Sequence, residues 1–272
     1  MRAYSPLRYP GGKGQMYDYI LDLLSKNNLL NCTYIEPYAG GAGIAIRLLF
    51  EKKVKKIIIN DFDKSIYAVW HSILYQTNDF ITLVKRTPVN MESWELQKKV
   101  QMMKDDVSLL ELGFSTFFLN RTNRSGIIKG GVIGGKTQVG NYKMDCRFNK
   151  GSLICLIEKI AKHEQVIEIH NLDAIDFIKK VKNKQNQFYF IDPPYYDKGK
   201  ELYTNFYNHD DHLNLSKFLT KSLKNKNYLI SYDNSEEIHK MYCKFNCEIM
   251  ELNYYAGTKR KGKEVFIKNN II

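Results

Sequence analysis

The sequence lacks the features that mark membrane and secreted proteins. Its longest apolar runs, such as the GIAIRLLF segment, fall far short of the ~20 residues that a membrane span needs. The amino-terminal residues MRAYSPLRYPGGK contain no apolar segment of the kind found in secretory signals. Cysteine is scarce, with five residues and no CxxC pair, which is typical of the reduced thiols of the cytoplasm. We therefore expect a cytoplasmic protein that does not enter a membrane.

Metal ligands are also too few to form a site. His239, Cys243 and Cys247 recur at four-residue intervals. A structural zinc site takes four ligands, however, and no fourth ligand accompanies these three. Cys247 also begins a predicted strand, so we expect no bound metal.

Positive charge is what the sequence has in excess. Its 272 residues include 41 Lys and Arg against 29 Asp and Glu, a formal net charge of +12. The hydrophobic share of 44% and the charged share of 26% are ordinary for a globular chain, which excludes a largely disordered protein. The surplus of cations indicates a polyanionic partner, nucleic acid first.

Short β-type runs alternate with helical patterns at both ends of the chain, which is typical of a mostly parallel sheet flanked by helices, an α/β fold. The last two runs, Cys247–Leu252 and Glu264–Lys268, predict an antiparallel hairpin at the carboxyl terminus. The predicted parallel strands are Tyr34–Glu36, Lys56–Asn60, Val166–His170, Phe188–Ile191 and Tyr228–Ser231.

About a hundred residues separate the second and third predicted strands, far more than one crossover helix requires. Residues 66–103 have a helical pattern, whereas residues 120–150 carry seven basic side chains, one acid and six glycines. A glycine-rich basic stretch of this length predicts an exposed hairpin or loop. We expect a sheet domain of residues 1–62 and 164–272, with residues 63–163 inserted as a partly helical second domain.

The loop after the first strand has the composition of a nucleotide site. Gly40, Gly41 and Gly43 let a ligand approach the backbone at the start of a helix, above the carboxyl end of a strand. Asp61 closes the second strand, where an acid can accept hydrogen bonds from both hydroxyls of a ribose. The third glycine of the dinucleotide fingerprint is missing. A plain strand-to-helix turn beside a solvated acid is the alternative.

The DPPY segment that follows the fourth predicted strand is more specific. Asp192 stands at the carboxyl edge of the same sheet, and two prolines fix the turn after it. The Asp192 carboxylate and the Pro193 carbonyl can each accept one hydrogen of an exocyclic amino group while Tyr195 stacks on the heterocycle. This pattern predicts chemistry on the amino group of a nucleobase. The structural alternative is a strand end with a packed tyrosine.

Five motifs resemble, in this order, those of the Dam-like class of DNA adenine methyltransferases: YPGGK, EPYAGGAG followed by ND, NRTNRSG, RFN and DPPY. The resemblance runs from Leu7 to about Asn269. It implies a Rossmann-like methyltransferase sheet with an inserted target-recognition domain. It also implies transfer of a methyl group from S-adenosylmethionine to the 6-amino group of an adenine flipped out of duplex DNA. Asp192, Pro193 and Tyr195 would be the catalytic residues.

The resemblance also assigns a set of residues to the methyl donor. Lys13 would hold its methionine carboxylate, Asp61 its ribose, and Asp173 its adenine amino group. The complete set is Tyr9, Lys13, Gly40, Gly41, Gly43, Asp61, Asp173 and Asp192.

The basic stretch would then be the target-recognition surface. Arg121 and Arg124 offer forked donors to guanine or phosphate. Asn123 and Gln138 can pair with adenine edges. The DNA-contact residues predicted in this way are Arg121, Asn123, Arg124, Lys129, Lys136, Gln138 and Arg147.

The chain departs from the family pattern in two places. Tyr9-Pro10 stands where the best-known members have Trp-Ala, and the segment GGVIGGKTQVGNYKMD differs from theirs in length and content. Their GATC target is therefore not carried over.

Several alternatives stay open at the level of sequence. A cytosine 4-amino methyltransferase uses similar chemistry, although those enzymes generally have serine where Asp192 stands. An RNA adenine methyltransferase fits the charge. A non-catalytic DNA-binding module or a dinucleotide-binding oxidoreductase would use the same kind of sheet. The expected partner is double-stranded DNA, met in the nucleoid. A monomer suffices for the chemistry, and a cognate restriction endonuclease of a restriction–modification pair would act separately.

Overall fold

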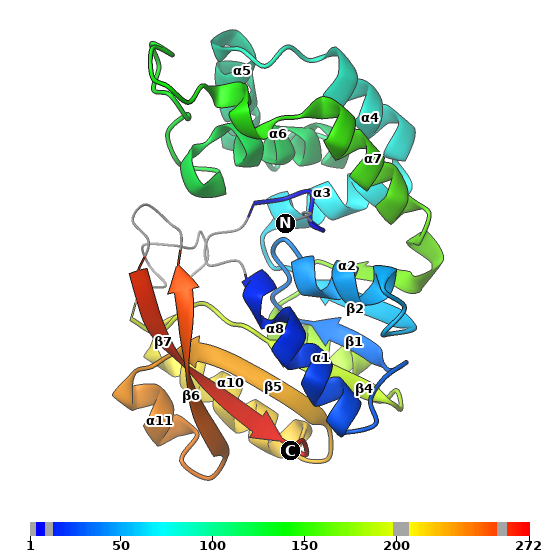
Figure 1. Ribbon diagram of the computed structural model, residues 1–272, viewed down its shortest axis with the longest axis vertical. Coiled ribbons are helices and arrows are strands. Elements are labelled where there is room, and N and C mark those ends of the chain that lie inside the picture. Colours follow the sequence, from blue (N-terminus) through cyan, green and yellow to red (C-terminus); the bar gives the residue numbers. More distant parts are fainter. Residues whose placement is uncertain (1–3, 9–12, 198–206, 255–259) are drawn as a thin grey trace. The chain divides into compact units, whose positions relative to one another are not determined.

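The computed structural model of the chain describes residues 4–8, 13–197, 207–254 and 260–272 (Figure 1). The chain divides into two compact units, which we describe one at a time. One unit comprises residues 1–12 and 64–169 and is helical; the other comprises residues 13–63 and 170–272 and contains most of the sheet. The sequence analysis placed residues 1–62 in the sheet domain. In the structure, residues 4–8 of that range belong to the helical unit.

The sheet has seven strands: β1 (Thr33–Glu36), β2 (Lys56–Asn60), β3 (Ile167–His170), β4 (Gln187–Ile191), β5 (Asn227–Asp233), β6 (Asn246–Tyr254) and β7 (Arg260–Asn269). Their order is β3-β2-β1-β4-β5-β7-β6. The β2–β1, β1–β4 and β4–β5 pairs are parallel, and β7 is antiparallel to both β5 and β6. Every residue of β1 and β4 is buried, as expected of central strands covered on both faces. The α/β fold with an antiparallel carboxyl-terminal pair is as predicted.

The helices among the described residues of this unit are η1 (Lys13–Met16), α1 (Tyr17–Lys26), α2 (Gly43–Phe50), α8 (Ala174–Val181), α10 (His209–Ser222) and α11 (Glu236–Met241). One hydrophobic core forms where α8, α10 and α11 cover one face of the sheet. Phe177 of α8 and Leu219 of α10 lie there against Tyr189 and Ile230 of the strands, all with no exposed surface. Helix α1 lies on the other face (Figure 1). Loops follow the parallel strands at their carboxyl edge.

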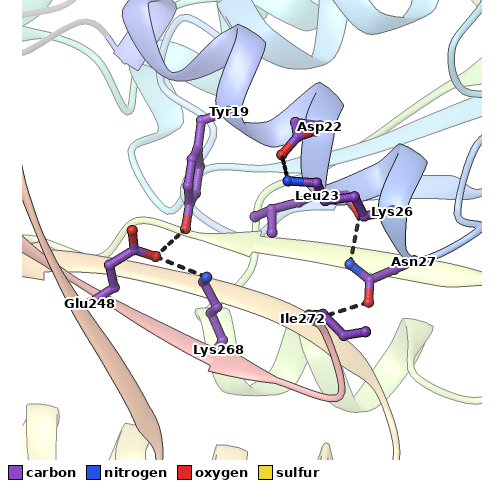
Figure 2. Close-up of polar contacts among 8 residues, drawn as sticks. All are labelled: Tyr19, Asp22, Leu23, Lys26, Asn27, Glu248, Lys268 and Ile272. Carbon is purple, nitrogen blue, oxygen red and sulfur yellow. Dashed lines mark hydrogen bonds and ion pairs between the residues drawn. The ribbon is translucent and has the colours of Figure 1, made fainter.

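Polar contacts attach α1 to the antiparallel hairpin and to the end of the chain (Figure 2). The hydroxyl of Tyr19 donates to Glu248 Oε2 at 2.9 Å, and the Lys268 ammonium lies 2.9 Å from the same oxygen. The backbone N–H of Ile272 donates to Asn27 Oδ1 at 2.9 Å. Strands β6 and β7 are thus tied to a helix that begins near the amino terminus of the chain.

The helical unit is arranged around α6 (Leu109–Thr122), in which every residue from 112 to 122 is buried. A capping box fixes its start, because Ser108 and Glu111 satisfy each other's backbone N–H groups. The ring of Phe117 packs edge-on against Phe80 and Phe148. The other helices of the unit are α3 (Lys64–Tyr75), α4 (Thr77–Arg86), α5 (Met91–Met102), η2 (Arg124–Gly126), η3 (Met144–Arg147), α7 (Lys150–Ala161) and η4 (Glu164–Val166).

The basic stretch begins inside α6 and continues as an irregular loop. The described chain contains one isolated β-bridge in this stretch, between Asn123 and Val132, rather than the paired strands of a hairpin. Side-chain hydrogen bonds from Asn123 and Gln138 to the backbone provide its order instead. No helix in the described part of the chain has the length and apolar character needed to cross a membrane.

Candidate active site and nucleic-acid interface

The glycine loop after β1 is bonded directly to the acid that follows β2. The Gly40 N–H donates to Asp61 Oδ2 at 2.8 Å, and the Asp63 N–H donates to Asp61 Oδ1 at 2.9 Å. Gly40 (φ 47°) and Ala42 (φ 43°) both have left-handed backbones. This conformation is strained for alanine and persists only where the surroundings fix it, often beside a ligand. The glycine loop and Asp61, which the sequence paired as one candidate nucleotide site, are therefore in direct contact.

Asp61 is half-buried, and its environment changes its acidity. Burial raises the pKa of Asp61 to about 7, although the N–H groups of Asp63 and Gly40 favour the charged form. A carboxylate held this way still has lone pairs free to accept hydroxyl hydrogens, as a ribose would require. Near neutral pH the side chain is therefore present both as the ionised carboxylate and as the protonated carboxyl group.

Asn60, the last residue of β2, fixes the loops on either side of it. It is buried, with 1% of its surface exposed. Its amide nitrogen donates to the carbonyls of Pro37 and Leu172, and its amide oxygen accepts from the Leu172 N–H at 3.0 Å. One side chain thus positions the glycine loop and the segment after β3.

The last residue of β1, Glu36, was not identified from the sequence. It is 5% exposed, and burial raises its pKa to about 8, with the nearby charge of Asp192 adding to the rise. The available signal is its place at the end of β1, directly before the glycine loop. Glu36 and Asp192 lie at the ends of two neighbouring parallel strands, β1 and β4.

The DPPY segment lies at the end of β4, beside β1 in the sheet. Asp192 is half-exposed, whereas Pro193 and Pro194 are buried. Since β1 and β4 are parallel neighbours, their following loops leave the same edge of the sheet. The glycine loop, Asp61 and Asp192 are therefore gathered at one edge.

Two residues that the sequence analysis did not identify, Ser231 of β5 and Glu264 of β7, hold the segment that carries Tyr195. Its ring is buried, with 5% exposed, and its hydroxyl donates to Glu264 Oε1 at 2.5 Å. Ser231 Oγ lies 2.9 Å from Glu264 Oε2 and 3.1 Å from Asp192 Oδ1. The segment that carries the candidate acid and aromatic ring is thus joined to β5 and β7.

Aromatic residues line the segments around this edge. The hydroxyls of Tyr38 and Tyr207 lie 2.9 Å apart, and Tyr207 also packs edge-on against His212. His212 is 1% exposed, and burial lowers its pKa to about 4, so it is a neutral packing residue at physiological pH.

The remaining predicted donor contacts are less fully described. Tyr9 lies outside the described residues, and of Lys13 the backbone alone is described, at the start of η1. Asp173 is exposed at the start of α8, where its Oδ1 caps the helix by accepting from Ile175 N at 2.8 Å.

Three of the predicted DNA contacts are committed to the fold of the helical unit. Asn123 has no exposed surface; it donates to the carbonyls of Ile127 and Ile128 and accepts from Trp94 Nε1 at 2.7 Å. Gln138 donates to two loop carbonyls and accepts from the backbone of Met144. Arg121 is 9% exposed. In this conformation Asn123 and Gln138 do not present their amides to adenine edges, which revises the expectation for both.

Arg121 belongs to a group of arginines that lie close enough to repel one another. Its Nε donates to the Pro6 carbonyl at 2.8 Å. Burial lowers its pKa to about 10, and the charges of Arg8 and Arg147 act in the same direction. No ion pair joins these three to an acid within the described ranges. A group of unneutralised guanidinium groups favours a polyanion. Arg8 was not among the predicted contacts, although it precedes the YPGGK motif.

The other predicted contacts are exposed on the loop and η3: Arg124, Lys129, Lys136 and Arg147. They remain available to phosphates and bases.

Comparison with known proteins decides what these features belong to. Residues 9–255 match the family model of the D12 class N6 adenine-specific DNA methyltransferases. The chain belongs to this family. Its function is therefore methylation of the 6-amino group of adenine in DNA, and the sequence-based prediction of an adenine-specific DNA methyltransferase is confirmed. The alternatives of a cytosine 4-amino methyltransferase, an RNA adenine methyltransferase, a non-catalytic DNA-binding module and a dinucleotide-binding oxidoreductase do not hold.

Relatives of the methyltransferase agree with this assignment. The chain is 24% identical over 262 residues to the type II methyltransferase M.MjaIII of Methanocaldococcus jannaschii, covering 88% of each chain. It is 34% identical over 94 residues to the modification methylase StsI of Streptococcus sanguinis, a match to 35% of this chain and 13% of the relative. A solved structure from Pyrococcus horikoshii, provisionally described as an RNA methyltransferase, is 10% identical with a TM-score of 0.44 over 97% of this chain and 87% of its own. At that score the likeness adds nothing to the fold described above.

Proposed function

We propose that S-adenosylmethionine is the methyl donor and that it binds at the carboxyl edge of β1 and β2. Gly40, Gly41 and Gly43 would line it, and Asp61 would accept hydrogen bonds from its ribose hydroxyls. The observation that carries the proposal is the hydrogen bond from Gly40 to Asp61, because it gives a glycine cradle and a ribose acceptor in one place. Tyr9, Lys13 and Asp173 stay predicted donor contacts.

The acceptor adenine would lie against Asp192, Pro193 and Tyr195, flipped out of duplex DNA. The Asp192 carboxylate and the Pro193 carbonyl would each accept one amino hydrogen, which leaves the nitrogen lone pair directed at the methyl group. The donor supplies a methyl group on a sulfonium. Formation of the nitrogen–carbon bond would break the carbon–sulfur bond of the donor, and the amino group would lose one proton to solvent. Stacking on Tyr195 would offset part of the few kcal/mol that flipping costs.

The helical unit would recognise the target. Arg124, Lys129, Lys136 and Arg147 are exposed there, and the arginine group of Arg8, Arg121 and Arg147 favours phosphate. The chain would act as a monomer in the cytoplasm. A partner endonuclease, where one accompanies it, would act as a separate protein.

The test is to express the chain in cells whose DNA lacks methylated adenine. We expect digestion of the DNA to nucleosides to yield N6-methyldeoxyadenosine, and single-molecule sequencing to show it at one short site. Asp192→Ala should abolish the product and leave duplex binding largely intact, because the substitution removes one of the two amino-group acceptors and leaves the basic side chains of the helical unit in place. Full activity in Asp192→Ala would contradict the catalytic assignment.

A further inference from the structure

A buried carboxyl group lies behind the DPPY segment on β7. Glu264 has no exposed surface, and its two oxygens accept from different partners: Oε1 from the Tyr195 hydroxyl at 2.5 Å and Oε2 from Ser231 Oγ at 2.9 Å. A carboxyl group is costly to bury unless its hydrogen-bonding capacity is used. Burial of this carboxyl group costs folding free energy, which its two hydrogen bonds offset. One of these hydrogen bonds comes directly from the candidate catalytic segment, and the other comes from Ser231, which also contacts Asp192.

Ser231 extends this contact to Asp192. The serine is fully buried on β5, and its Oγ lies 3.1 Å from Asp192 Oδ1 as well as 2.9 Å from Glu264 Oε2. The two side chains thus connect the acid and the aromatic ring of the DPPY segment into one chain of hydrogen bonds. Rotation of either catalytic side chain would break a contact inside the sheet.

The next residues of the same segment are held in a similar way. Asp233, paired with Glu264 in the β5–β7 ladder, accepts from the backbone N–H of Tyr196 at 2.8 Å and of Asp197 at 2.9 Å. Two neighbouring acids therefore hold the segment, one by side chains and one by backbone. The hairpin strand β7 takes part in the site although it lies outside the parallel part of the sheet.

We infer that Glu264 is a positioning residue of the methyl transfer, which fixes the ring of Tyr195 directly and the carboxylate of Asp192 through Ser231. The inference rests on the proposed function, since it takes Asp192 and Tyr195 as the groups that contact adenine. Preorganised acceptors contribute to rate because no reorientation is needed in the transition state. Glu264 itself does not contact the substrate.

The experiment compares three substitutions in the full chain with a matched control. Glu264→Ala removes both contacts. Glu264→Gln keeps the shape, because the amide oxygen accepts from Tyr195 and the amide nitrogen donates to Ser231, whose hydrogen then serves Asp192. Tyr195→Phe keeps the ring and removes one hydrogen bond. The control is Tyr228→Phe, which removes a buried hydroxyl on β5 that has no hydrogen-bond partner among the described residues.

For each variant we would measure kcat, the KM for S-adenosylmethionine and the melting temperature, using unmethylated duplex DNA as substrate. We expect kcat to fall about 100-fold in Glu264→Ala and about tenfold in Tyr195→Phe, each with unchanged donor KM, because the interactions removed orient the groups that would contact adenine. Glu264→Gln should stay within about fivefold of the wild type, and Tyr228→Phe should match it.

Two results would overturn the inference. One is wild-type kcat in Tyr195→Phe, and the other is a Glu264→Gln variant that is folded but as slow as Glu264→Ala. If Glu264→Ala fails to fold, the Gln and Phe variants still decide. A wild-type chain that places no methyl group on adenine from S-adenosylmethionine would instead contradict the proposed function, which makes the two failures distinguishable.

Discussion

Two acidic residues at the carboxyl edge of the sheet show how strongly burial raises the pKa of a carboxyl group in this protein. Asp61 and Glu36 each lie at the end of a strand, and burial raises the pKa of Asp61 to about 7 and of Glu36 to about 8. Acids with such pKa values change charge in the range where the enzyme works. Their effect on ligand binding should therefore appear as a dependence on pH.

Donor binding should weaken as the pH falls through 7. The ionised Asp61 accepts two ribose hydroxyls, whereas the protonated group loses an acceptor, so affinity is highest above the pKa and declines below it. We expect calorimetric affinity for S-adenosylmethionine to fall up to about tenfold per pH unit between about pH 7 and pH 5.5. Asp61→Asn should bind more weakly at about pH 7.5 and show little of this slope. A slope retained in Asp61→Asn would place the titrating group elsewhere.

At the residue scale the sequence predicted some site residues and missed others for a clear reason. Asp61 and Asp192 follow recognisable strands in distinctive motifs, and the structure places both at the carboxyl edge. Ser231 and Glu264 lie inside ordinary strand patterns, and their contacts depend on the register of the β5–β7 ladder. The order of strands in the sheet cannot be read from local pattern, so these residues could not be found.

Elements were easier to predict where apolar periodicity is strong. β2 has the predicted bounds, and the other strands differ from the predicted ones by a few residues at their ends. The basic stretch was harder, because composition indicated an exposed hairpin or loop, whereas the first part of it lies buried in α6. The sequence does not indicate that Arg121 and Asn123 are buried. Their hydrogen-bond partners, the Pro6 carbonyl and the indole N–H of Trp94, are distant in the sequence.

Neighbouring residues of this loop should respond differently to the same substitution. Asn123→Ala removes the partner of Trp94 Nε1 and of two backbone carbonyls, which should cost about 1–3 kcal/mol of unfolding free energy. Arg124→Ala, at an exposed position, should leave stability within about 0.5 kcal/mol and lower DNA affinity. Urea denaturation and duplex titration measure the two effects. Equal stabilities would contradict the structural role of Asn123.

For the whole molecule, the net charge of +12 has a direct consequence for binding. Each phosphate contact releases counterions, so the logarithm of the DNA association constant falls linearly with the logarithm of salt concentration. The basic residues do not contribute equally to DNA binding, because some lysines are paired with acids. Lys179, for example, lies 2.9 Å from Asp176.

Removal of an exposed loop cation should reduce this salt dependence. We expect Lys129→Ala and Lys136→Ala each to lower the slope by up to about one, the value for a single phosphate that is no longer neutralised, across duplexes of different sequence. Lys179→Ala, which removes the same charge from α8, should leave the slope unchanged. Fluorescence anisotropy from about 50 to 300 mM salt would measure it. An equal change in Lys179→Ala would mean that net charge alone determines binding.

The contacts of residues 4–8 have a consequence for engineering. Arg121 donates to the Pro6 carbonyl, and Asn120 exchanges two hydrogen bonds with the backbone of Arg8. A chimera that grafted residues 64–169 onto a foreign catalytic frame would leave these buried donors without acceptors. If the helical unit recognises the target, as proposed, exchange of target preference between relatives requires residues 4–8 to be transferred together with the helices.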